Sequence, residues 1–315
     1  MKHIIKALKL LLLVVGLFAI IIILLFGHRD IPLDELKAKY ANEASSFVDI
    51  NGMSVHIRDE GNKADTLPIV LIHGTGASLH TFEGWAAQLK EDHRVISMDL
   101  PGYGLTGPFV DGDYSIANYV EFIGELLSSL NINHCILGGN SLGGKIAWNF
   151  TLQNPNMVDK LILIDAAGYP TKAKSVPIAF QLAKVPILNK AFTYITPRFI
   201  VKRSVENVYA DQSKVTEALV DRYFEISLRE GNRRAFVDRL AAISVIKSYN
   251  RISSITHPTL ILWGKEDQLI PLESAYQFQK DLVNDTLVVL ENLGHVPMEE
   301  APERSLKPVL DFLAR

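Results

Sequence analysis

Short apolar runs that alternate with helical patterns constrain the fold of this 315-residue chain more than any other feature. Residues 69–72, 135–137 and 161–164 are continuously apolar, which predicts strands buried on both faces of a sheet. Helical patterns lie at 116–130 and 142–153. Helices of this length between buried strands predict parallel βαβ units, and so an α/β fold with a mostly parallel sheet flanked by helices. The same pattern predicts further strands at 53–59, 95–98, 259–263 and 287–290, and further helices at 82–89, 272–282 and the C-terminus.

The stretch 169–250 breaks this alternation. It holds no buried-strand run, and helical patterns occupy 215–228 and 234–246 instead. We therefore predict a core formed by residues 47–168 and 251–315, with a helical cap at 169–250 inserted into it. A long insertion at one place in an α/β sheet commonly covers the functional site.

The chain begins with a long apolar run. No charged residue occurs between Leu10 and Gly27, and the apolar character reaches back to Ile4. The run approaches the roughly 20 residues that a membrane span requires, and no A-x-A-like cleavage site follows it. Residues 4–27 are therefore predicted to form a transmembrane signal-anchor helix, with a long cleaved signal peptide as the alternative. Residues 28–46 are predicted to be a linker that lifts the domain off the bilayer.

The charges around this run predict its orientation. Lys2, Lys6 and Lys9 precede it, whereas only Arg29 closely follows it. The positive-inside rule then places the N-terminus in the cytoplasm and the folded domain in the periplasm or outside the cell. Cleavage of the segment would instead give a secreted protein.

The composition excludes several classes of function. The net charge of −3 lacks the basic bias of a nucleic-acid-binding protein. The one cysteine, Cys135, rules out an intramolecular disulfide and a CxxC site, and its apolar neighbours predict a buried strand position. The sequence holds no metal-ligand cluster, so we expect neither a metal nor a cofactor.

The strongest chemical signal is a G-x-S-x-G motif at residues 139–143, between a predicted buried strand and a predicted helix. The chain has to turn sharply there, and the two glycines leave room for a serine with a strained backbone. Ser141 is therefore predicted to be a nucleophile at the carboxyl edge of the sheet. A negatively charged intermediate formed on it would lie near a helix N-terminus.

A serine hydroxyl needs a base to take its proton and a carboxylate to orient that base. Loops that follow two later strands supply both groups. Asp267 comes after the strand at 259–263, and His295 comes after the strand at 287–290. Their order along the chain is the one that a nucleophile elbow predicts, so we expect Ser141, Asp267 and His295 to form a catalytic triad.

Other titratable groups near these positions have alternative interpretations. Asp165, at the end of the strand after the elbow, is an alternative acid for the triad, and Glu266 is a weaker one. Asp99 is expected to hold the loop that follows its strand. His73 is expected to shape the loop after residues 69–72, because His295 already fills the catalytic position.

An oxyanion hole requires two backbone N–H groups. One is expected from Leu142, directly after the nucleophile. The other is expected from Thr75, in the loop that follows the strand at 69–72.

Taken together, these motifs resemble the capped branch of the α/β-hydrolase superfamily over residues 47–315. That branch includes monoacylglycerol lipases and other esterases, meta-cleavage product hydrolases, proline iminopeptidases, cofactor-free haloperoxidases and epoxide hydrolases. The resemblance implies the α/β-hydrolase fold with an inserted helical cap. It rests on His73-Gly74-Thr75-Gly76, Asp99-Leu100-Pro101-Gly102-Tyr103-Gly104, Gly139-Asn140-Ser141-Leu142-Gly143-Gly144, Trp263-Gly264-Lys265-Glu266-Asp267 and Gly294-His295-Val296-Pro297.

Departures from these families narrow the expected reaction. Ser141 stands where epoxide hydrolases and haloalkane dehalogenases carry an aspartate nucleophile. Val296 follows His295, where meta-cleavage product hydrolases usually carry Trp, and Leu142 stands where proline iminopeptidases typically carry Trp. The expected reaction that remains is hydrolysis of a small acyl ester or a lipid by an esterase or lipase-like enzyme. The alternatives are C–C bond cleavage, amide or peptide hydrolysis or acyl transfer by the same triad, and a non-catalytic binding protein.

The predicted cap offers two further features. Its apolar side chains are candidates for the lining of an acyl pocket, with core packing as the alternative: Phe180, Leu182, Val185, Ile187, Leu188, Phe192 and Ile195. Between residues 169 and 251 the chain carries 15 Lys and Arg against 7 Asp and Glu. A basic cap could lie against anionic lipid, although a solvated helix surface explains the same charges.

Overall fold

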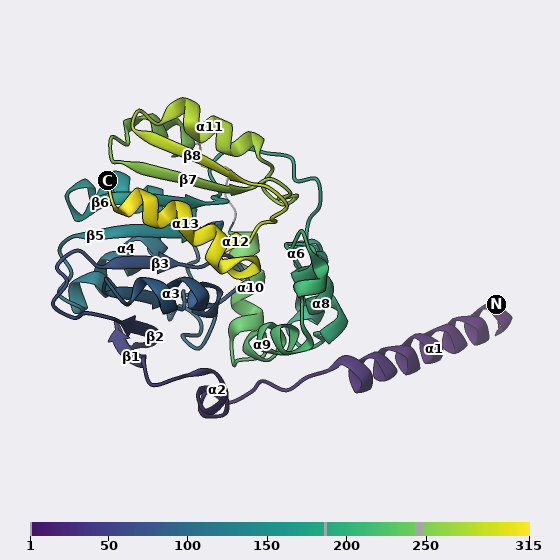
Figure 1. The fold of residues 1–315 in the computed structure, drawn as a ribbon. Helices are drawn as coiled ribbons and strands as arrows, with labels where there is room; N and C mark the ends of the chain where they lie inside the picture. The colour runs from purple at the N-terminus through teal and green to yellow at the C-terminus, as the bar shows by residue number, and fades with distance from the viewer. Residues whose placement is uncertain (1, 186–187, 243–247) are drawn as a thin grey trace.

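A twisted sheet lies at the centre of the molecule (Figure 1). The computed structural model describes residues 2–185, 188–242 and 248–315. In these residues the sheet has eight strands in the order β1-β2-β4-β3-β5-β6-β7-β8. Strand β2 runs antiparallel to both of its neighbours, and the pairs from β4 to β8 are all parallel. This confirms the predicted mostly parallel sheet. The strands are β1 (Ser45–Ile50), β2 (Met53–Glu60), β3 (Ile69–Ile72), β4 (Val95–Met98), β5 (Cys135–Asn140), β6 (Val158–Ile164), β7 (Thr259–Gly264) and β8 (Asp285–Leu290).

Helices cover both faces of the sheet, which explains the continuously apolar strands. Along β3, Val70 and Ile72 join the apolar cluster on one face, while Ile69 and Leu71 join the cluster on the other. Successive side chains of a strand point to opposite faces, so a strand covered on both sides has no polar position. The first face is covered by α4 (Ile116–Ser129), α5 (Leu142–Gln153) and α11 (Glu273–Asp281), and the second by α3 (Glu83–Leu89) and α13 (Pro302–Leu313).

Five helices lie between β6 and β7 in the described part of the chain, and we call this region the cap. They are α6 (Ile178–Ala183), α7 (Leu188–Phe192), α8 (Arg198–Glu206), α9 (Glu217–Ser227) and α10 (Asn232–Ala241). The helix expected at 215–228 begins only at Glu217, because the side chain of Thr216 caps it by accepting from the N–H of Leu219. The helix expected at 234–246 is α10, and residues 243–247 lie outside the described residues.

Helix α1 (Lys2–Phe26) projects away from the body of the protein (Figure 1). By its length and composition it could cross a membrane, and its apolar stretch is not buried inside the rest of the described chain. The predicted linker is not free-standing. It contains α2 (Leu33–Tyr40), whose Leu36 is buried, and Tyr40 donates a hydrogen bond to Glu225 of the cap (2.7 Å).

Candidate active site

Ser141 occupies a strained turn between β5 and α5. Its φ of 54° and ψ of −112° lie in a region that non-glycine residues rarely adopt. Only glycine fits at the two positions on either side of residues 140–142. A Cβ at Gly143 would overlap the backbone of Ile72, and one at Gly139 would overlap the backbone of Gly143. The turn leaves Ser141 mostly buried and facing a pocket beneath the cap.

The structure brings His295 and Asp267 together from two different loops. The Nδ1–H of His295 donates to Oδ2 of Asp267 at 2.6 Å, and both side chains are buried. The other oxygen of Asp267 accepts from the backbone N–H groups of Leu269 and Ile270, at 2.8 and 3.0 Å. These bonds fix the carboxylate. Because Nδ1 of His295 is bonded to that carboxylate, Nε2 is the nitrogen of the ring that remains free. His295 and Ser141 line the same pocket.

Asp165, the alternative acid, lies directly beside this pair. Side-chain ligand atoms of Asp165, Asp267 and His295 all lie within 4.8 Å of one another. One oxygen of Asp165 accepts from the N–H of Gly264 at 2.9 Å, and the residue is fully buried with a φ of 44°. Burial, followed by the charge of Asp267, raises the pKa of Asp165 well above its ordinary value. The hydrogen bond from His295 is made to Asp267 and not to Asp165, so the geometry favours Asp267 as the carboxylate that orients His295.

Glu266, the weaker alternative acid, is exposed on the outside of the same loop. Among the described residues, the cluster of Asp165, Asp267 and His295 is the one grouping of at least three His, Cys, Asp or Glu side chains close enough to hold a metal. Asp267 accepts from His295 and from two backbone N–H groups, and one oxygen of Asp165 accepts from Gly264. The other oxygen of Asp165 is buried without a hydrogen-bond partner in the described chain.

The two expected oxyanion donors, Leu142 and Thr75, lie directly after the nucleophile and in the loop after β3. Leu142 opens α5, so its N–H belongs to the first turn of the helix, where the backbone N–H groups lack intrahelical acceptors. Thr75 lines the pocket together with Ser141. Neither N–H donates to an acceptor elsewhere in the described chain. Both are therefore available to a ligand.

His73 and Asp99 shape neighbouring loops, as expected. His73 is fully buried, contacts the carbonyl of Gly74 through Nδ1 (2.8 Å) and accepts from the N–H of Leu100 through Nε2 (3.0 Å). Burial lowers the pKa of His73, so its ring is neutral. Asp99 accepts from the N–H groups of Leu79 and Leu105, each at 2.8 Å.

Cys135 is buried in β5, as expected from its apolar neighbours. Burial raises the pKa of its thiol to about 12, so the group is unreactive at neutral pH.

Sequence analysis missed two groups that hold the His295 loop. The backbone N–H of His295 donates to the carbonyl of Val208, which belongs to the cap (2.8 Å). Glu300, in α12 (Pro297–Glu300), is buried and accepts from Gly294 at 2.8 Å and from the cap residue Asp211 at 2.8 Å. A glutamate five residues after a histidine has no motif that marks it, because its partners become neighbours only in the folded chain.

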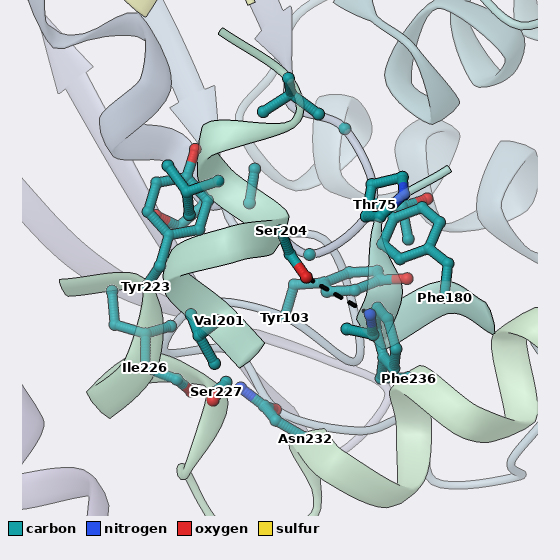
Figure 2. A pocket seen from close by; sticks show the side chains of 18 of the residues that line it. Thr75, Tyr103, Phe180, Val201, Ser204, Tyr223, Ile226, Ser227, Asn232 and Phe236 are labelled. Atoms are coloured by element: carbon teal, nitrogen blue, oxygen red, sulfur yellow. Dashed lines mark hydrogen bonds between the residues drawn. The ribbon is translucent and has the colours of Figure 1, made fainter. Parts of the chain in front are cut away.

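Ser141 and residues of the cap line one mainly apolar pocket, part of which is shown in Figure 2. Tyr103, Phe180 and Phe236 lie together beside Thr75, and Val201 and Ile226 form the opposite side. The hydroxyl of Tyr103 is buried without a hydrogen-bond partner in the described chain, and burial raises its pKa to about 12. Sequence analysis did not single out this residue.

The expected lining of the pocket is right at two positions. Phe180 and Phe192 line it. Leu182, Val185, Leu188 and Ile195 are absent from the lining. Leu182 packs in the core of the cap instead, which is the alternative named for this group. Val185, just after α6, and Leu188, at the start of α7, are exposed on the outer side of the cap. Ile187 lies outside the described residues.

Comparison with known proteins places this site in a family. A family model described as the alpha/beta hydrolase fold matches residues 68–302. The 2-hydroxy-6-oxo-2,4-heptadienoate hydrolase of Pseudomonas putida is 28% identical over 282 residues, which cover 86% of this chain and 97% of that protein.

Two solved structures are similar over nearly their whole length. A membrane phospholipase A, described as a bacterial virulence factor, has a TM-score of 0.75 at 25% identity, covering 100% of this chain and 98% of that one. A putative lipase of Acinetobacter baumannii has a TM-score of 0.74 at 25% identity, covering 90% and 94%. The sheet order, the strained serine after β5 and the match over most of the core lead to one conclusion: the chain belongs to the alpha/beta hydrolase fold family and is a hydrolase.

Proposed function

We propose that the protein is a membrane-anchored serine hydrolase that cleaves carboxylic esters through an acyl-enzyme intermediate. The observation that carries the proposal is the hydrogen bond from His295 to Asp267, with Ser141 and His295 on one apolar pocket. A buried, oriented imidazole beside a strained serine is the arrangement that nucleophilic acyl transfer requires.

In the first half of the reaction, Oγ of Ser141 attacks the ester carbonyl carbon while Nε2 of His295 takes the hydroxyl proton. The carbonyl oxygen becomes an oxyanion that accepts hydrogen bonds from the N–H groups of Leu142 and Thr75. The C–O bond to the alcohol then breaks, and the imidazolium of His295 gives the alcohol oxygen its proton. Asp267 keeps the ring in the tautomer that this exchange needs.

In the second half, water attacks the acyl-serine and gives one proton to His295. The tetrahedral intermediate collapses, the carboxylic acid leaves, and His295 returns the proton to Ser141. No metal or cofactor takes part in these steps.

The pocket supports an acyl substrate rather than a small polar one, because its walls are mainly apolar side chains of the cap. Similarity to a membrane phospholipase A and to a putative lipase supports a lipid ester. Val296, in place of the Trp usual in meta-cleavage product hydrolases, supports the same choice.

Helix α1 supports the anchor. Its 25 residues, at about 1.5 Å per residue, are long enough for the roughly 30 Å of bilayer hydrocarbon. We propose a single-pass protein with a cytoplasmic N-terminus and the hydrolase outside that membrane, with cleavage and secretion as the alternative.

Hydrolysis of a C–C bond is the second candidate. The relative that acts, by its name, on 2-hydroxy-6-oxo-2,4-heptadienoate favours it, at 28% identity. Amide hydrolysis and acyl transfer would use the same three side chains.

The decisive experiment assays the full-length protein in detergent against p-nitrophenyl esters from acetate to palmitate, 2-hydroxy-6-oxo-2,4-heptadienoate and an anilide. We expect ester turnover that falls at least about 1,000-fold in Ser141→Ala, with an unchanged melting temperature. Ester turnover that survives in Ser141→Ala would refute the nucleophile. Turnover of the dienoate alone would replace the ester hydrolase by a C–C hydrolase. A protein inert to all substrates and to a fluorophosphonate probe would be a binding protein.

A further inference from the structure

The joint between α1 and the folded domain is made with the cap, not with the core. Directly after α1, the backbone of Gly27 forms an antiparallel bridge with Ile195. The carbonyl of Phe26 accepts from Thr196 at 3.1 Å, and the N–H of His28 donates to Tyr194 at 3.2 Å. The end of the apolar helix and the segment 194–196 therefore lie at the same level.

Side chains and a second bridge continue this joint. The rings of Phe26 and Phe199 meet edge to face with centroids 5.9 Å apart. Asp30 forms an ion pair of 2.6 Å with Arg233 of α10, and the N–H of Ile31 donates to the carbonyl of Leu228 at 2.8 Å. The segment from Phe26 to Ile31 therefore contacts α8, α10 and the end of α9. These contacts restrict how α1 can tilt relative to the cap.

The cap carries an apolar surface beside this joint, which we call the outer face. Its large hydrophobic side chains are between 42% and 73% exposed, and they all fall in one stretch of 22 residues that adjoins the end of α1: Ile178, Val185, Leu188, Tyr194 and Phe199. Scattered exposed apolar residues are ordinary, but a cluster of this kind marks an interaction surface.

The stretch of sequence that carries the outer face is basic: residues 166–205 contain seven Lys and Arg and no Asp or Glu. Arg198, Lys202 and Arg203 pair with carboxylates that follow this stretch in the sequence. Lys184 and Lys190 are exposed, and the ion pairs of the described chain include neither. Exposed apolar and aromatic groups among unpaired lysines are the pattern of a surface that lies in the headgroup region of an anionic bilayer.

The same helices form the wall of the pocket on their inner side. In α6, Ile178 is exposed while its neighbours Ala179 and Phe180 line the pocket. In α7, Leu188 is exposed while Phe192 lines the pocket. A single layer of helices thus separates the outer face from the space above Ser141.

We infer that the outer face of the cap rests in the headgroup region of the bilayer that holds α1, and that the ester substrate enters the pocket from that leaflet. The physical reason is continuity: the end of a membrane span lies at the interface, so the backbone hydrogen-bonded to it lies there too. The inference rests on the proposed anchor. It adds the partner, an anionic phospholipid leaflet, and the side from which substrate arrives.

Fluorescence quenching by brominated lipid tests the contact. Cys135 is buried, so single cysteines introduced as Tyr194→Cys and Phe199→Cys can be labelled with an NBD maleimide in the full-length protein. The protein is placed in nanodiscs of phosphatidylcholine and phosphatidylglycerol, with brominated or plain acyl chains. We expect brominated chains to lower the emission at both positions by about half, because interfacial side chains reach the acyl boundary. Tyr276→Cys, an exposed tyrosine on α11 of the core, is the matched control and should not be quenched.

A label on the anchor separates the two ways of failing. Leu17→Cys in α1 should be quenched strongly. Quenching at residue 17 without quenching at 194 and 199 would overturn the contact while leaving the anchor intact. No quenching at residue 17 would refute the anchor itself, and the contact with it.

Activity on two kinds of ester tests the route of entry. We expect Leu188→Glu with Tyr194→Glu to lower hydrolysis of a phospholipid in vesicles at least about fivefold, since charges are unfavourable at an apolar membrane face. Hydrolysis of dissolved p-nitrophenyl butyrate should change less than about twofold, because neither side chain lines the pocket. Tyr276→Glu should change neither rate. Equal losses on both esters, or no loss on the vesicle substrate, would overturn the proposed route.

Discussion

The core and the cap place their side chains by different physical means. In the core, Ser141, Asp267 and His295 each stand in a loop directly after a parallel strand, and short hydrogen bonds hold Asp267 and His295. In the cap, short helices carry apolar side chains on both an inner and an outer side. Hydrogen bonds specify one geometry, whereas apolar contacts specify mainly volume. The core is therefore suited to chemistry, and the cap to the choice and delivery of substrate.

The cap and the core are nevertheless joined by hydrogen bonds at the His295 loop. The N–H of His295 donates to Val208, and Glu300 connects the His295 loop to Asp211, so two cap residues help to hold a core loop. Variants in the core, in the cap and at this junction should therefore differ in their effects on activity and on stability.

Asp267→Asn should cause the largest loss among these variants, with kcat on a p-nitrophenyl ester about 100- to 10,000-fold lower. The one amide oxygen is needed by the N–H groups of Leu269 and Ile270, so the amide NH2 faces Nδ1 of His295 and the ring loses the correct tautomer. Steady-state kinetics measure the effect, with Glu266→Gln as the exposed neighbouring control. Activity within tenfold of the wild type would mean that Asp165 serves as the acid.

Glu300→Gln acts at the junction of the two regions. It replaces a buried carboxylate that accepts from Gly294, Ala210 and Asp211, and hydrogen bonds to such a group are worth about 1.5–3 kcal/mol each. We expect a drop in melting temperature of several degrees and kcat lower by about tenfold, because the His295 loop moves. The exposed Glu303→Gln in α13 is the control. An unchanged kcat with a lower melting temperature would restrict Glu300 to stability.

Phe236→Ala tests the cap as a determinant of substrate size. Its ring contacts Phe180 and Phe192, with centroids 5.3 and 5.9 Å away. Loss of this apolar surface should raise KM about five- to tenfold for octanoyl and longer esters, and should leave acetate nearly unaffected. The chain-length profile of kcat/KM measures the change. A loss that is equal for acetate and octanoate would indicate damage to the core instead.

Asp165→Asn should have the smallest effect on activity and a pH-dependent effect on stability. Asp165 has a pKa raised by burial, so the folded state holds its proton longer than the unfolded state. Below the ordinary carboxyl pKa, Asp165 therefore makes its full contribution to the stability of the wild type. That contribution is lost as pH rises through the raised pKa of Asp165 in the folded state.

Asparagine does not titrate, so Asp165→Asn does not undergo this loss. Between pH 4 and pH 8 the melting temperature of the variant should therefore rise relative to that of the wild type, by on the order of 2 °C or more. We expect kcat within about threefold of the wild type, since the amide can still donate toward Asp267. Thermal unfolding at several pH values measures the shift. A difference that stays constant with pH would show that Asp165 is ionised in the folded protein.

The sequence by itself determined the α/β-hydrolase fold and a candidate site. Strand positions follow from local apolar runs, and β3, β4 and α5 have the predicted bounds because each is limited by adjacent turn residues or by Ser141. The site residues follow from the same rule, since a residue after a parallel strand lies at the carboxyl edge of the sheet wherever the rest of the chain goes. Short motifs therefore carried the prediction of Ser141, Asp267 and His295.

The tertiary structure alone decided the contacts between distant segments. It placed Glu300 against Asp211, set Asp165 beside Asp267, and turned Val185 and Leu188 outward. It also joined the end of α1 to the cap through Gly27 and Ile195, which are 168 residues apart in the sequence. The physical reason is that helices in the cap have two apolar sides, and only packing against the core and against the end of α1 decides which side faces the pocket.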